Sequence, residues 1–294
     1  MYKRRGEMKF LTCINHSTIL TTPVDKAIRI ADEAGFEGFD FQEKDLDEYV
    51  ITKKKDIKEL AELFASLKIK PFCFTGLHRY LPNFEFTTDE EFEKEKEKVI
   101  PLFEALQTLG VEVAIKPELG RPVVPSIEKI WSYKKCFENA VKRNRQLTDS
   151  AQQYGIKIAF EFTGGSNFIN CIERTIEVVN QVNHENFGFG LDTYHMYKAD
   201  DKLEEYERIP GDRIFSVHFM NALDIPRNRI NDFDRDYCLE GKLNLVPFLK
   251  LLDKKGYNGY LTIEIFGEKD WEQDPSKIAK KAYKSVVDLI KIVE

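Results

Sequence analysis

The sequence has few cysteines, no long apolar run and no excess of basic residues. Its five cysteines in 294 residues are scattered and form no C-x-x-C pair, which favours reduced, structural thiols in a cytoplasmic protein. No stretch approaches the roughly 18 apolar residues of a membrane-spanning helix, so we expect no membrane segment. The formal net charge is −6, and this disfavours a nucleic-acid partner because phosphate binding usually needs a basic face. A small-molecule substrate is the better expectation.

A dinucleotide-binding turn is missing as well. No G-x-G-x-x-G follows the first strand-like segment, where the sequence reads Cys13-Ile14-Asn15-His16, so a dinucleotide fold loses its best support. No linker, low-complexity segment or repeat interrupts the chain. We therefore expect a frayed N-terminal extension over residues 1–8 and a single domain over 9–294. The sequence leaves open whether Met1 or Met8 is the natural start.

Short apolar runs alternate with longer amphipathic stretches along the whole chain. Strands that alternate with helices imply a parallel sheet covered by helices. Eight such units in this length favour an α/β fold, a closed (β/α)₈ TIM barrel, over an open doubly wound sheet. The eight apolar runs end near Ile14, Phe41, Thr75, Lys116, Phe162, Asp192, Phe219 and Phe266.

In the second half of the chain, four of these runs each carry one metal-binding side chain at or near the end of the predicted strand: Glu161, Asp192, His218 and Glu264. A charge within an apolar run is costly to bury unless something pairs with it. A single acidic residue at a strand end is more often a helix cap or a salt-bridge partner. Four at successive strand ends would meet at the carboxyl-terminal mouth of a barrel, and one divalent ion explains them together. Three carboxylates and one imidazole without a thiolate suit Mn²⁺, Mg²⁺, Co²⁺ or Zn²⁺.

Such a site predicts a particular chemistry. A divalent ion at the mouth can hold the carbonyl and a neighbouring hydroxyl of a polyol and neutralise the enediolate that forms when an α-proton leaves. A carboxylate that gives one oxygen to the metal keeps the other for proton transfer. We therefore predict that Glu161 and Glu264 are the acid/base pair. The alternative is that both are only ligands and that a water or a histidine moves the proton.

The four segments that carry these residues, at 155–162, 190–195, 214–218 and 260–266, resemble the sugar isomerase/epimerase barrels of the xylose isomerase-like superfamily, and most of all the inosose (2-keto-myo-inositol) isomerases. The likeness runs from about Lys9 to the C-terminus. It implies one divalent metal held by Glu161, Asp192, His218 and Glu264, and the isomerisation or epimerisation of a keto-sugar or keto-polyol.

The resemblance also implies substrate-binding roles for His195 and Arg235, which match family residues by position. The alternatives are that His195 caps the following helix and that Arg235 forms a loop salt bridge with Asp232 or Glu240. Lys116, at the end of the fourth strand, could reach a substrate oxygen, although an exposed lysine before a proline is the default interpretation.

Several positions depart from the inosose isomerase pattern and leave the substrate open: His16, Asp40 to Gln42, Met220 and Asn221. A dehydratase of inosose or dehydroshikimate type would share the first step and is hard to separate by sequence. Apurinic endonucleases of the same barrel type use three zinc ions and about nine ligands. Their Asp-x-His segment reads Asp234-Arg235-Asp236 here, and a charged Lys116 is a poor zinc ligand, so this alternative is disfavoured. A sugar-binding protein without turnover is a further alternative. The sequence fixes neither the native metal nor the oligomeric state, a homo-oligomer included.

Overall fold

The computed structural model describes residues 10–82, 84–118, 120 and 132–293. The extension predicted over residues 1–8, and with it the choice between Met1 and Met8, lies outside the described residues.

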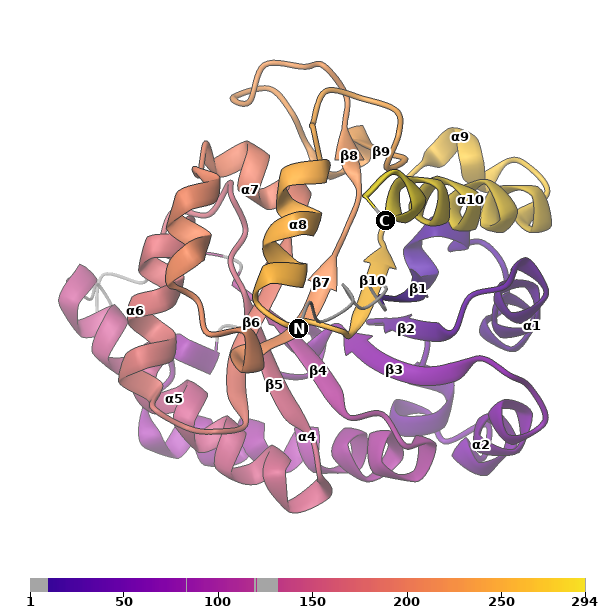
Figure 1. Cartoon of the computed structure of the whole chain (residues 1–294). Coiled ribbons are helices and arrows are strands. Elements are labelled where there is room, and N and C mark those ends of the chain that lie inside the picture. Colours follow the sequence, from indigo (N-terminus) through magenta and orange to yellow (C-terminus); the bar gives the residue numbers. More distant parts are fainter. Residues whose placement is uncertain (1–9, 83, 119, 121–131, 294) are drawn as a thin grey trace, which may run out of the picture.

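Eight parallel strands close into one barrel (Figure 1). Neighbouring strands follow the order of the chain, and β1 pairs with both β2 and the last strand, β10, so the barrel has no free edge. This confirms the predicted single-domain (β/α)₈ TIM barrel. The strands are β1 (Leu11–Asn15), β2 (Gly38–Gln42), β3 (Lys70–Thr75), β4 (Val113–Pro117), β5 (Lys157–Glu161), β6 (Phe187–Asp192), β7 (Ile214–His218) and β10 (Tyr260–Ile263).

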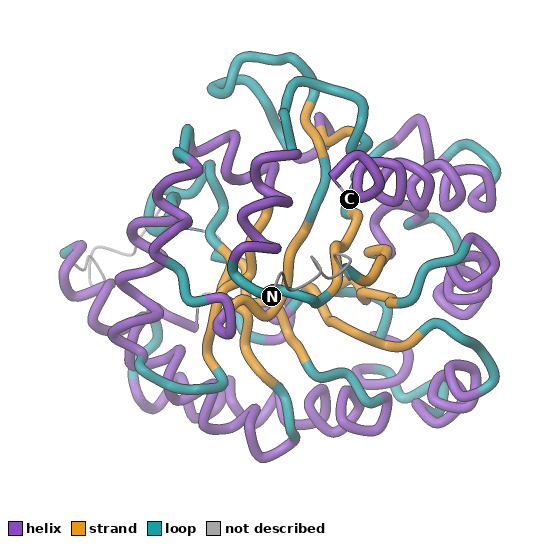
Figure 2. The backbone as a smooth tube through the Cα atoms, in the orientation of Figure 1, coloured by secondary structure: helices purple, strands orange, loops and turns teal. Residues whose placement is uncertain are grey.

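Helices surround the barrel on its outer side (Figure 2). The α-helices are α1 (Val24–Ala34), α2 (Ile57–Ala65), α3 (Leu77–Tyr80), α4 (Asp89–Leu109), α5 (Tyr133–Ala151), α6 (Ile172–Val182), α7 (Thr193–Ala199), α8 (Val246–Lys254), α9 (Glu268–Trp271) and α10 (Pro275–Val293). Helix α4 shows how local sequence sets an element: Thr88 and Glu91 form a capping box at its start, and Gly110, at φ 81°, ends it in the left-handed region that glycine tolerates.

The strands are buried on both faces. Every residue of β2 and of β6 is buried, which explains why these segments read as continuous apolar runs in the sequence. Inside the barrel, the rings of Phe72 on β3 and Tyr260 on β10 lie 4.2 Å apart although these strands are not neighbours. Tyr260 begins its strand, so this ring pair fills the amino-terminal end of the interior and leaves the opposite end for polar side chains.

The connection from β7 to α8 contains a small antiparallel pair, β8 (Asn221–Ala222) and β9 (Arg235–Asp236). It packs onto α9, because the Tyr237 hydroxyl donates to Asp270 Oδ2 at 2.7 Å. This excursion carries Arg235 back to the carboxyl-terminal end of the barrel. None of the helices in the described ranges is long and apolar enough to cross a membrane.

Candidate metal centre

The four predicted ligands converge on one point at the carboxyl-terminal mouth. Glu161, Asp192 and His218 are the last residues of β5, β6 and β7, and Glu264 directly follows β10. All four are buried. Around His218 Nδ1 lie Glu161 Oε1 at 3.1 Å, Glu264 Oε2 at 3.3 Å and Asp192 Oδ2 at 3.8 Å. Ligand atoms of Glu161, Asp192 and His218 all lie within 4.8 Å of one another.

The hydrogen bonds of the His218 imidazole indicate that the four side chains suit a bound cation. His218 Nε2 lies 3.0 Å from Asp40 Oδ2, so a neutral ring that donates there turns the lone pair of Nδ1 toward the three carboxylates. Neither Nδ1 nor Glu161 Oε1 makes a hydrogen bond of good geometry within the described chain. Buried acceptors that face one another are costly unless a cation lies between them. Three carboxylates and one imidazole therefore fit a divalent ion such as Mn²⁺, Mg²⁺, Co²⁺ or Zn²⁺.

The pKa shifts of the site residues also indicate that the site favours a cation. Burial opposes protonation of His218, but the carboxylates of Glu264 and Glu161 outweigh it and raise the pKa of the imidazole well above its ordinary value. Burial raises the pKa of Glu161. For Glu264, burial acts in the same direction, but the positive charges of His218 and Arg235 prevail and lower its pKa. The centre of the cluster is thus a place that strongly favours positive charge.

Arg235 lies against the ligands. Its Nη1 is 2.7 Å from Asp192 Oδ2 and 3.1 Å from Glu264 Oε2, and its guanidinium lies over the rings of Tyr194 and Phe266. A looser contact of 3.6 Å joins it to Asp232, as the salt-bridge alternative expected. Arg235 is therefore held at the candidate metal centre by two carboxylates and by contacts with two aromatic rings.

His195 also reaches the site, but it does not begin the helix. It lies inside α7, and the residue that caps α7 is Asp192, whose Oδ1 accepts the His195 backbone N–H at 2.9 Å. The His195 ring is buried, with Nε2 3.5 Å from Arg235 Nη2 and Nδ1 3.4 Å from the Gly164 backbone nitrogen. His195 and Arg235 thus form one polar face beside the four ligands.

Lys116 differs from the exposed lysine that its sequence context suggested by default. Only 2% of its surface is exposed at the end of β4. It forms an ion pair with Glu85 and donates to the Pro117 carbonyl at 2.8 Å. The structure brings Lys116 to the mouth but gives it these partners rather than placing it in the ligand cluster.

Four polar residues that were not predicted to contact the metal ligands form a network beside them. Asp40 accepts from Asn15 Nδ2 at 2.8 Å and from Thr75 Oγ1 at 3.0 Å. Gln42 Nε2 donates to Asn15 Oδ1 at 2.7 Å and to Glu264 Oε1 at 3.2 Å. The signal was present in β2, where Asp40 and Gln42 alternate with Phe39 and Phe41 and so share one face of the strand.

The positions that depart from the inosose isomerase pattern have different surroundings. Both ring nitrogens of His16 are occupied, by Asp45 Oδ1 at 2.6 Å and the Thr22 carbonyl at 2.9 Å. The Asn221 amide holds the backbone of Cys238 and Leu243. Gln42 contacts Glu264, and the sulfur of Met220 lies 3.4 Å from Arg235 Nη1. Asp40 contacts His218, so Asp40, Gln42 and Met220 are the departing positions in this set that touch residues of the site.

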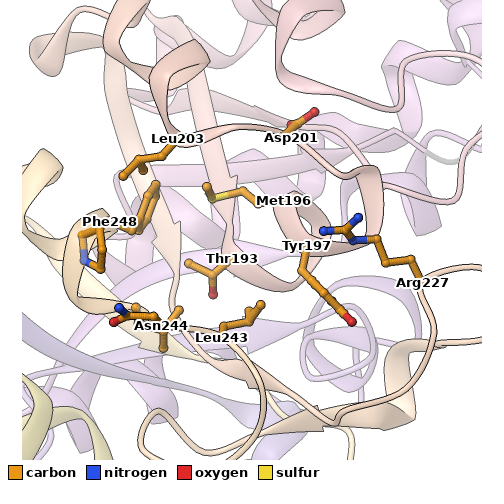
Figure 3. Close-up of a pocket in the computed structure, with 11 residues that line it drawn as sticks. Thr193, Met196, Tyr197, Asp201, Leu203, Arg227, Leu243, Asn244 and Phe248 are labelled. Atoms are coloured by element: carbon orange, nitrogen blue, oxygen red, sulfur yellow. The ribbon is translucent and has the colours of Figure 1, made fainter.

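A cavity of about 300 Å³ lies beside α7 (Figure 3). None of the four ligands lines it, and most of its side chains are apolar. A polyol needs many hydrogen-bond partners, so the polar mouth suits such a substrate better than this cavity. The lining residues are Thr193, Met196, Tyr197, Asp201, Leu203, Arg227, Leu243, Asn244, Leu245, Pro247 and Phe248.

Comparison with known families agrees with the barrel and with the resemblance read from the sequence. The family model described as xylose isomerase-like TIM barrel matches residues 28–289. The chain belongs to this family. Members of the xylose isomerase-like family therefore provide the relevant comparisons for the site.

Three relatives are informative. An inosose isomerase of Bacillus velezensis is 25% identical over 290 residues, which cover 94% of this chain and 96% of that protein. A 3-dehydroshikimate dehydratase of Pseudomonas aeruginosa is 24% identical over 80% of this chain but 35% of its own length. The crystal structure of IOLI protein with a bound zinc atom superposes with a TM-score of 0.85 at 26% identity and covers 98% of this chain and 99% of that one. The present chain is an enzyme of this family.

Proposed function

We propose that this enzyme is a divalent-metal-dependent isomerase or epimerase of a keto-sugar or keto-polyol. The observation that carries the proposal is the pair of buried carboxylates, Glu161 and Glu264, that approach His218 Nδ1 at 3.1 and 3.3 Å. The similarity to an inosose isomerase over nearly the whole length of both chains supports the same reaction class.

In the proposed site, Glu161, Asp192, His218 and Glu264 hold the ion. A bound divalent ion would polarise the substrate carbonyl and offset the negative charge that develops as the α-proton leaves. The zinc atom in the similar IOLI structure supports a divalent metal of some kind. Asp192 and His218 serve mainly as ligands, because Asp192 is tied to Arg235 and α7, and His218 to Asp40.

Glu161 and Glu264 move the protons. One carboxylate removes a proton from carbon, and the other returns it, to the neighbouring carbon in an isomerase or to the opposite face in an epimerase. The two groups are not equivalent. Glu264 is held by Arg235 on Oε2 and by Gln42 on Oε1, whereas Glu161 Oε1 makes no hydrogen bond within the described chain.

His195 and Arg235 bind the substrate in this proposal. The guanidinium of Arg235 presents several donors in one plane, which suits the oxygens of a polyol. Its contacts with the rings of Tyr194 and Phe266 restrict the orientation of that plane. Lys116 is a third candidate for a substrate oxygen if it exchanges its contact with Glu85 for one with the ligand.

The test is metal-dependent exchange of a substrate C–H proton with D₂O. Inososes and ketoses are incubated with the enzyme and Mn²⁺, Mg²⁺, Co²⁺ or Zn²⁺, and deuterium incorporation is followed by NMR. We expect exchange that chelation abolishes and that falls by about 10²- to 10⁴-fold in Glu264→Gln and in Glu161→Gln.

Glu240→Gln is the matched control, because Glu240 is paired with Lys281 on the surface and its exchange rate should equal that of the wild type. Full turnover in Glu264→Gln would show that the proton-transfer assignment is wrong. No exchange with any candidate substrate would favour a binding protein.

A dehydratase is the second candidate, favoured by the similarity to a 3-dehydroshikimate dehydratase over 80% of this chain. It would use the same proton abstraction and then expel a hydroxyl group as water. Mass spectrometry of the product separates the two reactions, since an isomerase or epimerase leaves the substrate mass unchanged and a dehydratase lowers it by one water.

A further inference from the structure

Asp40 is completely buried and faces the candidate metal centre from the opposite side of the barrel. It lies on β2, and its Oδ2 is 3.0 Å from Nε2 of His218 on β7. Strands β2 and β7 are not neighbours in the barrel, so the contact crosses the interior. It engages the ring nitrogen of His218 that does not point at Glu161 and Glu264.

The carboxylate of Asp40 is itself held from two further strands. Asn15 on β1 donates to Oδ2 at 2.8 Å, and Thr75 on β3 lies 3.0 Å from both oxygens. Three donors from three strands leave Asp40 no freedom to rotate away from His218. Asn15 is fixed in turn, because its Oδ1 accepts from Gln42 and from the Ser17 backbone.

The chemistry of imidazole makes this arrangement directional. A ring nitrogen that binds a metal must present a lone pair, so the proton of the neutral ring has to lie on the other nitrogen. A carboxylate that accepts this proton selects one tautomer and one ring orientation and makes the ligating nitrogen more basic. At His218 the nitrogen selected as ligand is Nδ1.

We infer that Asp40 is a positioning residue that holds His218 with Nδ1 toward the metal, and that Asn15 and Thr75 hold Asp40. The inference rests on the proposed metal centre. It assigns a role in catalysis to β1, β2 and β3, which supply none of the four ligands. Gln42 extends the same network to Glu264 through Oε1, so two of the four ligands are braced from this half of the barrel.

The experiment is Asp40→Asn in the full chain, measured by metal affinity and by ring tautomer rather than by activity. Chelator competition with Zn²⁺ and Co²⁺ should give a dissociation constant about 10- to 100-fold weaker than that of the wild type. In protein labelled with ¹⁵N at its five histidines, the His218 signals are assigned with His218→Gln. With Zn²⁺ bound, the wild type should show a proton on Nε2 and a metal-bound Nδ1, and Asp40→Asn should shift or broaden these signals.

Asp149→Asn is the matched control, since Asp149 pairs with His184 at 3.5 Å on the outer surface, and it should leave metal affinity unchanged. If Asp40→Asn does not fold, Thr75→Val removes one donor to Asp40 and keeps the His218 contact, and a several-fold loss of affinity is expected. Wild-type affinity together with an unchanged tautomer in the folded variant would overturn the inference. If the wild type binds none of these metals, the proposed metal centre itself is wrong.

Discussion

Glu118 is a buried carboxyl group one residue beyond the end of β4. Its backbone N–H donates to the Glu161 carbonyl at 2.8 Å, and its Oε1 accepts from Gly120 at 2.7 Å. Oε2 makes no hydrogen bond of good geometry within the described residues. Burial raises the pKa of Glu118 to about 7, and the negative charge of Glu85 adds to the effect.

This raised pKa predicts that Glu118 lowers the free energy of unfolding at alkaline pH. Between its ordinary pKa of 4.5 and about 7, the folded chain keeps a proton that the unfolded chain releases, so stability falls as pH rises. A shift of this size corresponds to about 3 kcal/mol. Glu118→Gln should therefore be more stable than the wild type by up to about 3 kcal/mol at pH 8 and nearly equal to it at pH 4.

Urea unfolding at pH 4, 6 and 8 in the presence of a chelator measures this difference. Glu240→Gln, an exposed residue, should show no such pH dependence. A stability gain in Glu118→Gln that is the same at all three pH values would contradict the shifted pKa.

At the scale of single residues, the sequence indicated where the four proposed ligands lie, but not which residues they contact. Glu161, Asp192, His218 and Glu264 stood out because each interrupts or ends an apolar run. Asp40 also interrupts one, but its partner His218 is 178 residues away and meets it only across the closed barrel. No local pattern contains that contact, so the bracing of His218 could not be predicted.

At the scale of elements, Asp192 joins the end of β6 to the start of α7. Its Oδ1 caps the helix by accepting the His195 N–H, while its Oδ2 contacts Arg235. The same carboxylate is a proposed metal ligand. The strand end, the helix start and the metal centre are therefore coupled through one side chain.

Substitution of Asp192 separates the two roles. Asp192→Asn and Asp192→Ala should both lose bound metal, because neither supplies a charged oxygen. Asparagine is as good a helix cap as aspartate, whereas alanine loses the cap. In chelator, Asp192→Asn should therefore be more stable than Asp192→Ala by about 0.5–2 kcal/mol.

Metal content by mass spectrometry and urea unfolding measure the two effects. Since both variants break the contact with Arg235, their difference isolates the cap. Wild-type metal content in Asp192→Ala would refute the ligand assignment, and equal stability of the two variants would refute the capping role.

The elements themselves were largely predictable. Apolar runs fixed seven strand ends to within one residue, since a strand buried on both faces has little choice of composition. The last strand ends at Ile263 rather than near Phe266. Beyond it, the backbone N–H of Ile265 donates to Thr18 Oγ1 at 3.3 Å and not to a neighbouring strand. The two-residue strands β8 and β9 are too short to show a periodic pattern. The place of Arg235 at the site was therefore predicted from the family resemblance alone.

At the scale of the whole molecule, the proposed metal centre draws on nearly every strand. The ligands lie on or directly after β5, β6, β7 and β10, and the polar network beneath them comes from β1, β2 and β3. A metal ion bound there would contact segments that are far apart in the sequence and come together only in the closed barrel. Metal binding should therefore be linked to global folding rather than to the order of one loop.

That linkage gives a prediction that needs no substrate. Any ion that binds the folded chain alone stabilises it by an amount set by its concentration relative to its dissociation constant, about 2.7 kcal/mol at a hundredfold excess. We expect Mn²⁺, Co²⁺, Zn²⁺ or Mg²⁺ to raise the unfolding temperature of chelator-treated enzyme by several degrees, and the most effective ion identifies the preferred metal. Asp192→Ala should lose most of this rise. Because weak adsorption to surface carboxylates would stabilise both proteins alike, an equal rise in the variant would mean that the ion does not bind at the barrel mouth.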